Sequence, residues 1–140
     1  MSARESANAL LDHLMKSFNI KGLAFNKDNE CILTIDSKIV VLFYLNEANN
    51  ALLLNAIVDT IDTNHPRIQK LMYELLCGNF NWTLTSGGTL GIDKNTGMLT
   101  LCYKYTLPVD SVIFMKTLSN LTARVEYWTQ RITEIEKGKE

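Results

Sequence analysis

The chain has 140 residues, of which 46% are hydrophobic and 21% are charged. This length and composition predict one domain with an ordinary core and argue against wholesale disorder. The 14 Lys and Arg residues nearly balance the 15 Asp and Glu residues, which leaves a formal net charge of -1. Domains that bind nucleic acids usually carry a clear basic excess, so the balance argues against a nucleic-acid partner.

Neither a membrane span nor a disulfide framework is indicated. The longest apolar run, Ile39–Leu45, is far shorter than the ~20 residues that cross a bilayer. The first 18 residues contain no apolar stretch of signal-peptide length, so we expect the protein to stay in the cytoplasm. The three cysteines are widely spaced and odd in number, which favours reduced core thiols over disulfides or a zinc site.

The first predicted element is an amphipathic helix. Ser2 and Glu5 have the spacing of a capping box, which satisfies free N–H groups at a helix start. Asn19 and Gly22 are plausible stop signals, because both residue types tolerate positive φ. The apolar residues between these signals recur at helical spacing: Ala7, Leu10, Leu11, Leu14 and Phe18.

After Gly22 the apolar period changes from helical to alternating, which predicts strands. We expect a short strand at Leu23–Phe25, then strands at Cys31–Ile35 and Ile39–Leu45, separated by Asn- and Asp-containing turns. The segment Ala51–Asp59 fits either a fourth strand or a short helix, and the Asn-rich turns that bracket it favour a strand.

A second helix is expected to begin around Asn64-His65-Pro66, with Pro66 near its first helical position, and to end at Gly78. Three further strands are predicted after this helix, joined by Gly- and Asn-containing turns. These strands are Phe80–Thr85, Thr89–Asp93 and Met98–Leu107.

Asp110 is a natural N-cap for a long last helix. Its apolar positions step alternately by four and three residues: Phe114, Leu118, Leu121, Val125, Trp128, Ile132 and Ile135. The element order predicts an α+β fold, an antiparallel β-sheet with three helices. We expect one domain over residues 1–136 and a frayed tail over 137–140.

No constellation of residues in the sequence favours catalysis. The two histidines, His13 and His65, have no carboxylate or cysteine at metal-ligand spacing. The run from Gly87 to Gly91 lacks the lysine of a phosphate loop and precedes a strand, so a β-turn is the better interpretation. We therefore expect no enzyme activity, no cofactor and no metal.

What remains is an apparent surplus of apolar positions for a domain of this size. Helices covering both faces of the sheet would account for part of it. The alternative is that some of these residues are exposed and bind a partner.

The order of these motifs resembles the class I type III secretion chaperones (CesT/SycE-like family) of Gram-negative bacteria. The resemblance spans nearly the whole chain, and no single piece of it is specific. It rests on the opening ALLDHLMKSFNIKGLAFNKDNECILTIDSKIVVLFYL, on IQKLMYELLCGNFNW with the following TLTSGGTLGIDKNTGMLTLCYKYTL, and on the closing VEYWTQRI. One departure is that Asn19–Leu23 replaces the usual Leu-Gly-Leu link.

The resemblance implies a homodimer that binds the non-globular N-terminal segment of a secreted effector and keeps it competent for secretion. By the family pattern, the effector-binding patch would comprise Leu11, Leu14, Phe18, Leu23, Phe25, Ile32 and Val40. The dimer interface would use Leu71, Leu75, Phe80 and Trp82. For every one of these residues the alternative is a place in the core.

Two other functions stay open. Some members of the family are regulatory chaperones that sequester an anti-activator and couple secretion to transcription. An α+β domain of this size could also be a monomeric carrier that holds a small apolar ligand in an internal cavity.

Overall fold

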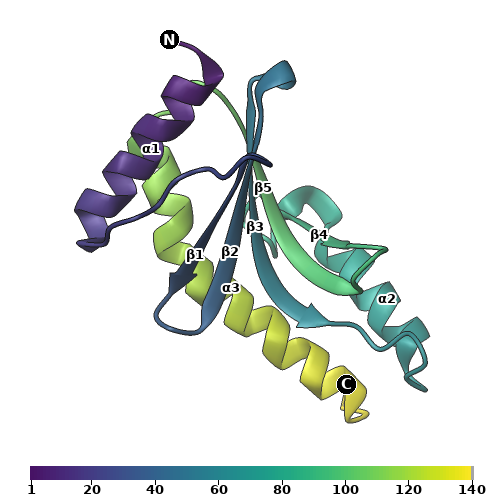
Figure 1. Cartoon of the computed structure of the whole chain (residues 1–140). Helices are drawn as coiled ribbons and strands as arrows, with labels where there is room; N and C mark the ends of the chain where they lie inside the picture. The colour runs from purple at the N-terminus through teal and green to yellow at the C-terminus, as the bar shows by residue number, and fades with distance from the viewer. Residues whose placement is uncertain (140) are drawn as a thin grey trace.

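The computed structural model describes residues 1–139 and has the expected α+β class (Figure 1). The last residue of the expected frayed tail, residue 140, lies outside the described residues. The elements, in chain order, are α1 (Ala3–Phe18), β1 (Glu30–Ile35), β2 (Ile39–Asn46), the short 3-10 helix η1 (Glu47–Asn49), β3 (Ala51–Thr60), α2 (Ile68–Gly78), the 3-10 helix η2 (Phe80–Trp82), β4 (Thr89–Ile92), β5 (Met98–Thr106) and α3 (Ser111–Glu136).

The strands form one antiparallel sheet with the order β1-β2-β3-β5-β4. The first three strands follow one another as a meander, while α2 and β4 intervene before β5 returns to pair with β3 (Figure 1). The two edges of the sheet are therefore β1 and β4. The expected strand over residues 51–59 is confirmed, and it pairs on both sides, with β2 and with β5.

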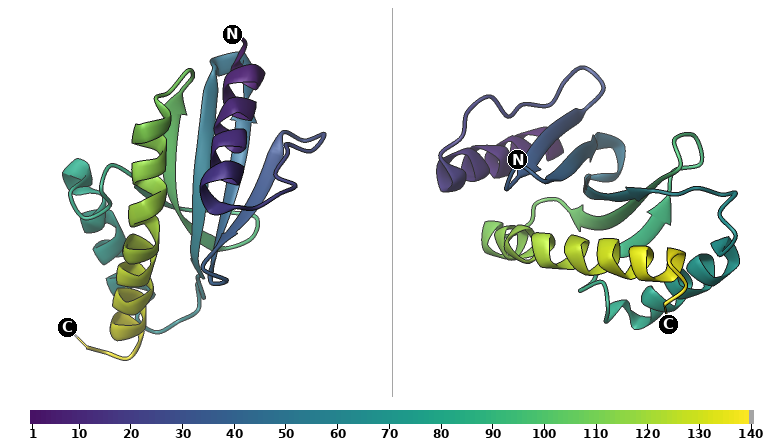
Figure 2. Two further views of the ribbon diagram at one scale, coloured as in Figure 1. Left: turned by 90° about the vertical axis from the view of Figure 1, so that its left-hand side faces the viewer. Right: turned by 90° about the horizontal axis from the view of Figure 1, so that it is seen from below.

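One face of the sheet forms the core with α1 and α3. The two helices contact each other, α1 also contacts β2, and α3 runs along β3 (Figure 2). Phe43 of β2 lies with its ring centroid 6.0 Å from that of Phe114 on α3. Alternation within the strands sends Ile32 and Tyr44 to the opposite face, where both are exposed.

The helix signals read from the sequence are confirmed. Ser2 and Glu5 form the predicted capping box, and the left-handed Asn19 ends α1. Asp110 caps α3 by accepting a hydrogen bond from the Val112 N–H. Helix α3 packs against β3, α1 and α2, which buries all seven predicted stripe positions: Phe114, Leu118, Leu121, Val125, Trp128, Ile132 and Ile135.

The predicted strand over Phe80–Thr85 is wrong. The segment forms η2 and then a series of turns, because Asn81 and Trp82 both adopt left-handed backbone with φ 55°. The side chain of Asn79, just before this segment, also binds the backbone of Leu90, which draws the chain back toward β4. The β-forming residue types of the segment are outweighed by this long-range contact.

Two further predictions need correction. Leu23–Phe25 forms no strand: Leu23 and Phe25 pack against the core, but the segment joins no ladder of the sheet. Helix α2 begins at Ile68, so Pro66 precedes the helix instead of occupying its first turn. The described chain therefore has five strands, and its one long connection, residues 19–29, runs between α1 and the edge strand β1.

Candidate functional site

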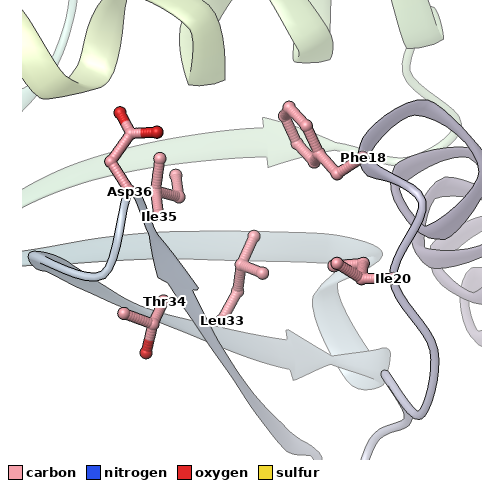
Figure 3. Close-up of a pocket in the computed structure, with 6 residues that line it drawn as sticks. All are labelled: Phe18, Ile20, Leu33, Thr34, Ile35 and Asp36. Atoms are coloured by element: carbon pink, nitrogen blue, oxygen red, sulfur yellow. The ribbon is translucent and has the colours of Figure 1, made fainter.

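A pocket lies between the C-terminal end of α1 and the edge strand β1. It encloses about 240 Å³, and an engineered apolar cavity of about 150 Å³ already holds benzene, so the pocket has room for a branched or aromatic side chain. Phe18 and Ile20 lie at one end, Asp36 at the other, and Leu33 and Ile35 between them (Figure 3). We call this site the edge pocket; it is lined by Phe18, Ile20, Leu33, Thr34, Ile35 and Asp36.

The turn that follows β1 is fixed to α3, which sets the position of the pocket's polar end. Asp36 and Ser37 both have left-handed backbone, and the Lys38 N–H donates to the Ile35 carbonyl at 3.1 Å. The Lys38 ammonium pairs with Glu126 of α3 at 3.0 Å. This exposed ion pair is worth only about 0–1 kcal/mol, so it biases the turn toward α3 weakly and adds little to the stability of the fold.

The two edges of the sheet differ in their free backbone groups. Strand β1 pairs only with β2, and at its first residue Asn26 occupies the outer edge: the Glu30 N–H donates to Asn26 Oδ1 at 2.9 Å, and the Glu30 carbonyl accepts from the Asn26 N–H at 2.8 Å. On β4 the side chain of Asn79 takes the place of a neighbouring strand: its Nδ2 donates to the Leu90 carbonyl at 3.1 Å, and its Oδ1 accepts from the Leu90 N–H at 2.8 Å. Because β1 is the longer strand and is covered only at its first residue, whereas β4 is short and is covered at its second, the edge beside the pocket offers the longer template for an added strand.

The predicted binding patch is not brought together as one surface. Leu11 and Leu14 are buried in the core, with 2% and 0% of their surface exposed, so a partner cannot reach them in this fold. Phe18 is exposed and lines the edge pocket, whereas the exposed Ile32 and half-buried Val40 lie on the opposite face of the sheet. Leu23 and Phe25, in the connection before β1, are half-buried against the core.

Sequence reasoning placed only Phe18 of the edge pocket in the binding patch and missed the other five members: Ile20, Leu33, Thr34, Ile35 and Asp36. Leu33 carried a usable signal, because its alternation with Ile32 places it on the α1 side of the strand. Asp36 carried none, since an aspartate in a tight turn ordinarily serves the local backbone.

A second apolar surface covers α2, η2 and β4. Tyr73, Leu76 and Phe80 follow one another at helical spacing, and each is at least 64% exposed. Trp82 joins them to β4, because its Nε1 donates to Thr89 Oγ1 at 3.3 Å. We call this surface the α2 patch; it comprises Tyr73, Leu76, Phe80, Trp82 and Ile92.

The predicted interface residues divide between this patch and the core. Phe80 and Trp82 are exposed members of the patch, while Leu71 and Leu75 are buried beneath it. Leu76 borders a groove of about 230 Å³ with Ile92, and neither residue was among those predicted for the interface. Contiguous exposed apolar residues of this kind are characteristic of protein-protein contacts.

The shifted ionisable groups have structural causes. Burial raises the pKa values of the Cys31 and Cys102 thiols, so both stay protonated and unreactive at neutral pH. Burial also raises the pKa of Tyr103 to about 12, and its hydroxyl donates to the Thr85 carbonyl at 2.6 Å. A hydrogen bond from Arg4 lowers the pKa of Glu47 and ties the start of α1 to the β2–β3 connection.

Within residues 1–139 no group of three or more His, Cys, Asp or Glu side chains is placed to hold a metal ion. In the same part of the chain, none of the helices combines the length and the apolar character that a membrane crossing requires. The apolar features of the described surface are the edge pocket beside strand β1 and the α2 patch.

Comparison with known proteins places this fold. The family model described as "Tir chaperone protein (CesT) family" matches residues 9–129. A search of the curated proteins finds no match. Among solved structures, a chain of the ExsC-ExsE complex superimposes with a TM-score of 0.77 at 24% identity, covering 93% of this chain and 96% of that one.

Two other solved structures share the fold. A chain of the HopA1-SchA chaperone-effector complex has a TM-score of 0.74 at 20% identity, covering 91% of this chain and 96% of that chain. A chain of the Yersinia pestis complex of the type III secretion chaperone SycH with a fragment of YscM2 has a TM-score of 0.64 at 17% identity, covering 86% and 97%. At these identities the likeness concerns the fold.

Proposed function

The chain belongs to the Tir chaperone protein (CesT) family, and from this premise we propose that it is a type III secretion chaperone. It binds the non-globular N-terminal segment of a secreted effector in the cytoplasm of a Gram-negative bacterium and keeps that segment ready for export. This proposed function requires binding of the segment and no catalysis. The observation that carries the proposal for this chain is the apolar edge pocket beside strand β1, whose outer side pairs with no other described strand.

The mechanism follows from the geometry of that edge. An extended segment can pair its backbone with the outer groups of β1, which supplies affinity without regard to sequence. Its alternate side chains then face two environments: the edge pocket on the α1 side, and Ile32 on the other face. Because the bound segment is extended, it stays unfolded while its apolar side chains are shielded from aggregation.

We further propose that two copies associate through the α2 patch into a homodimer. Full burial of one Leu, Phe or Met side chain contributes about 1.5–3 kcal/mol. The patch contains several such side chains, and in a two-fold symmetric interface each of them is buried twice, once from each copy. The dimer would leave both β1 edges free, so that one segment could wrap around it or each copy could bind its own.

The test uses purified full-length chain and the N-terminal segments of type III effectors from the same bacterium, co-expressed one at a time. Light scattering on the isolated complex gives the mass, and limited proteolysis reports whether the bound segment is globular. We expect a complex of two chains with a bound segment that proteases still cut readily outside its contact region. A panel of segments that all fail to bind, or a bound segment that is fully protease-resistant and folded, would contradict the proposal.

The second candidate function is that of a regulatory chaperone, and the observation that supports it is the similarity in fold to a chain of the ExsC-ExsE complex. Such a chaperone would bind a small anti-activator at the same edge. Competition separates the two roles: an anti-activator that effector segments displace indicates the regulatory role. The small-ligand carrier predicts instead a monomer that binds apolar probes inside the fold and no polypeptide.

A further inference from the structure

Asp36 is the one charged group that lines the edge pocket. Four of the other lining side chains are purely hydrocarbon, those of Phe18, Ile20, Leu33 and Ile35 (Figure 3). Asp36 is exposed and lies at the end of the pocket away from α1. A partner side chain that enters the pocket therefore has a carboxylate at one side only.

The turn does not require a carboxylate at this position. Asp36 has a φ of 53°, a left-handed conformation that Gly or Asn would adopt with at least equal ease. The carboxylate does little for the turn, because the closing hydrogen bond runs from the Lys38 N–H to the Ile35 carbonyl. Its negative charge is thus free to serve something outside the turn.

Within residues 1–139 no Lys or Arg forms an ion pair with this carboxylate. Its hydrogen bond within residues 1–139 comes from Thr122 Oγ1, at a long 3.4 Å. The nearest lysine in sequence, Lys38, pairs with Glu126 instead. A carboxylate has about four acceptor sites, so Asp36 keeps most of its capacity for a donor that arrives with a partner.

The residues at the other end of the pocket have lysines as near neighbours in the chain. Lys21 follows Ile20 directly, Lys16 lies in the last turn of α1, and both are exposed. A cation on a bound segment is therefore attracted toward Asp36 and repelled from the α1 end. The apolar pocket fixes where the anchoring side chain sits, and the two charged ends fix which way the segment runs.

We propose that Asp36 is a specificity-determining residue, which selects extended segments carrying a Lys or Arg on one fixed side of the apolar side chain that fills the edge pocket. This inference rests on the proposed binding of an extended segment at β1. It adds the charge pattern of the partner, which neither the fold nor the family membership supplies.

The experiment is a selection from a library of random peptides displayed on phage, using the intact full-length protein as bait. Four baits are compared: the wild type, Asp36→Asn, Asp36→Lys and the control Asp62→Asn. Asn tolerates the left-handed backbone and can still accept from Thr122, so Asp36→Asn removes the charge and keeps the turn. Asp62 is an exposed loop aspartate outside the pocket, and its role as acceptor for the Asn64 N–H is one that Asn can also fill.

The wild type and Asp62→Asn should both enrich peptides with a Lys or Arg at one fixed offset from an apolar anchor. The bait Asp36→Asn should lose this enrichment and keep the apolar anchor. A synthetic peptide from the wild-type selection should bind it about two- to five-fold more weakly, the range typical of exposed ion pairs, with the difference shrinking at high salt. The bait Asp36→Lys should enrich an acidic residue at the same offset.

Apolar-anchored peptides with no charge preference, or with one that Asp36→Asn leaves unchanged, would overturn the role of Asp36 while leaving the chaperone proposal intact. If the wild type enriches no apolar-anchored peptide at all, peptide binding at the edge pocket fails and the inference fails with it.

Discussion

The substitution Leu76→Arg should convert the proposed dimer to monomers. Leu76 lies in the α2 patch with 73% of its surface exposed, so the isolated protomer hardly depends on it. Burying a whole Leu side chain is worth about 1.5–3 kcal/mol, and burying the exposed part accordingly about 1–2 kcal/mol. A two-fold interface contains the residue twice, so its loss costs about 2–4 kcal/mol, or roughly 30- to 1,000-fold in dimer affinity.

The assay is sedimentation equilibrium over a range of protein concentrations, with thermal unfolding followed by circular dichroism as a check on the fold. Val112→Arg is the matched control, because Val112 is also 73% exposed but lies at the start of α3, outside the α2 patch. We expect Leu76→Arg to be monomeric where the wild type and Val112→Arg are dimers. Equal dimer affinity for both variants would refute the assignment of the interface to the α2 patch.

Three further predictions concern the core, the edge strand and the alkaline limit of stability. Gly78→Ala should lower the free energy of unfolding, measured by urea titration, by about 1–3 kcal/mol or more, because a Cβ at this position would lie 2.2 Å from the buried ring of Trp128. Gly91→Ala is the control and should cause no such loss, since a Cβ there has no atom within 4 Å. Ile32→Asp should lower the free energy of unfolding by only about 1 kcal/mol, yet weaken binding of an effector segment measured by calorimetry. Replacing the buried Leu14 by Ala should lower the free energy of unfolding by about 2–5 kcal/mol. Equal losses for the two variants would mean that Ile32 belongs to the core. The pKa of Tyr103 in the folded protein, about 12, exceeds its ordinary value of 10, so its contribution to the free energy of unfolding is complete below pH 10 and is lost as the pH rises toward 12. The difference in stability between the wild type and Tyr103→Phe should therefore shrink over that range, and a constant difference would count against the raised pKa.

The parts of the fold that the sequence predicted are those fixed by local chemistry. A capping box needs only Ser2 and Glu5, and the left-handed Asn19 needs only its own short side chain, so both were recognisable without tertiary context. The buried positions of α3 were also predictable, because an apolar repeat sustained over a long helix defines a single buried face.

Tertiary contacts decided the elements that the sequence analysis predicted wrongly. The residues at 80–85 have strand propensity, but the hydrogen bonds of Asn79 to Leu90 turn the chain before any ladder can form. The alternation at 23–25 predicted a strand, but a strand also needs a partner: Leu23 and Phe25 pack against the core, and no described strand pairs with the segment. Propensity reports the local preference and not the presence of a neighbour.

The binding surface was the hardest part to predict, because apolar residues on one helical stripe look alike whether they are buried or exposed. Leu14 and Phe18 are four residues apart on α1, yet the first is fully buried and the second lines the edge pocket. What separates them is where the sheet ends beneath the helix. That boundary is a property of the assembled fold.

The measurement that tests the central claim most directly is backbone hydrogen exchange of the full-length protein with and without a bound effector segment. Strand addition predicts that the segment slows exchange along β1, Glu30–Ile35, and at the end of α1 around Phe18. Strand β4, whose edge Asn79 already covers, should change little. Protection at β4 with none at β1 would contradict the account.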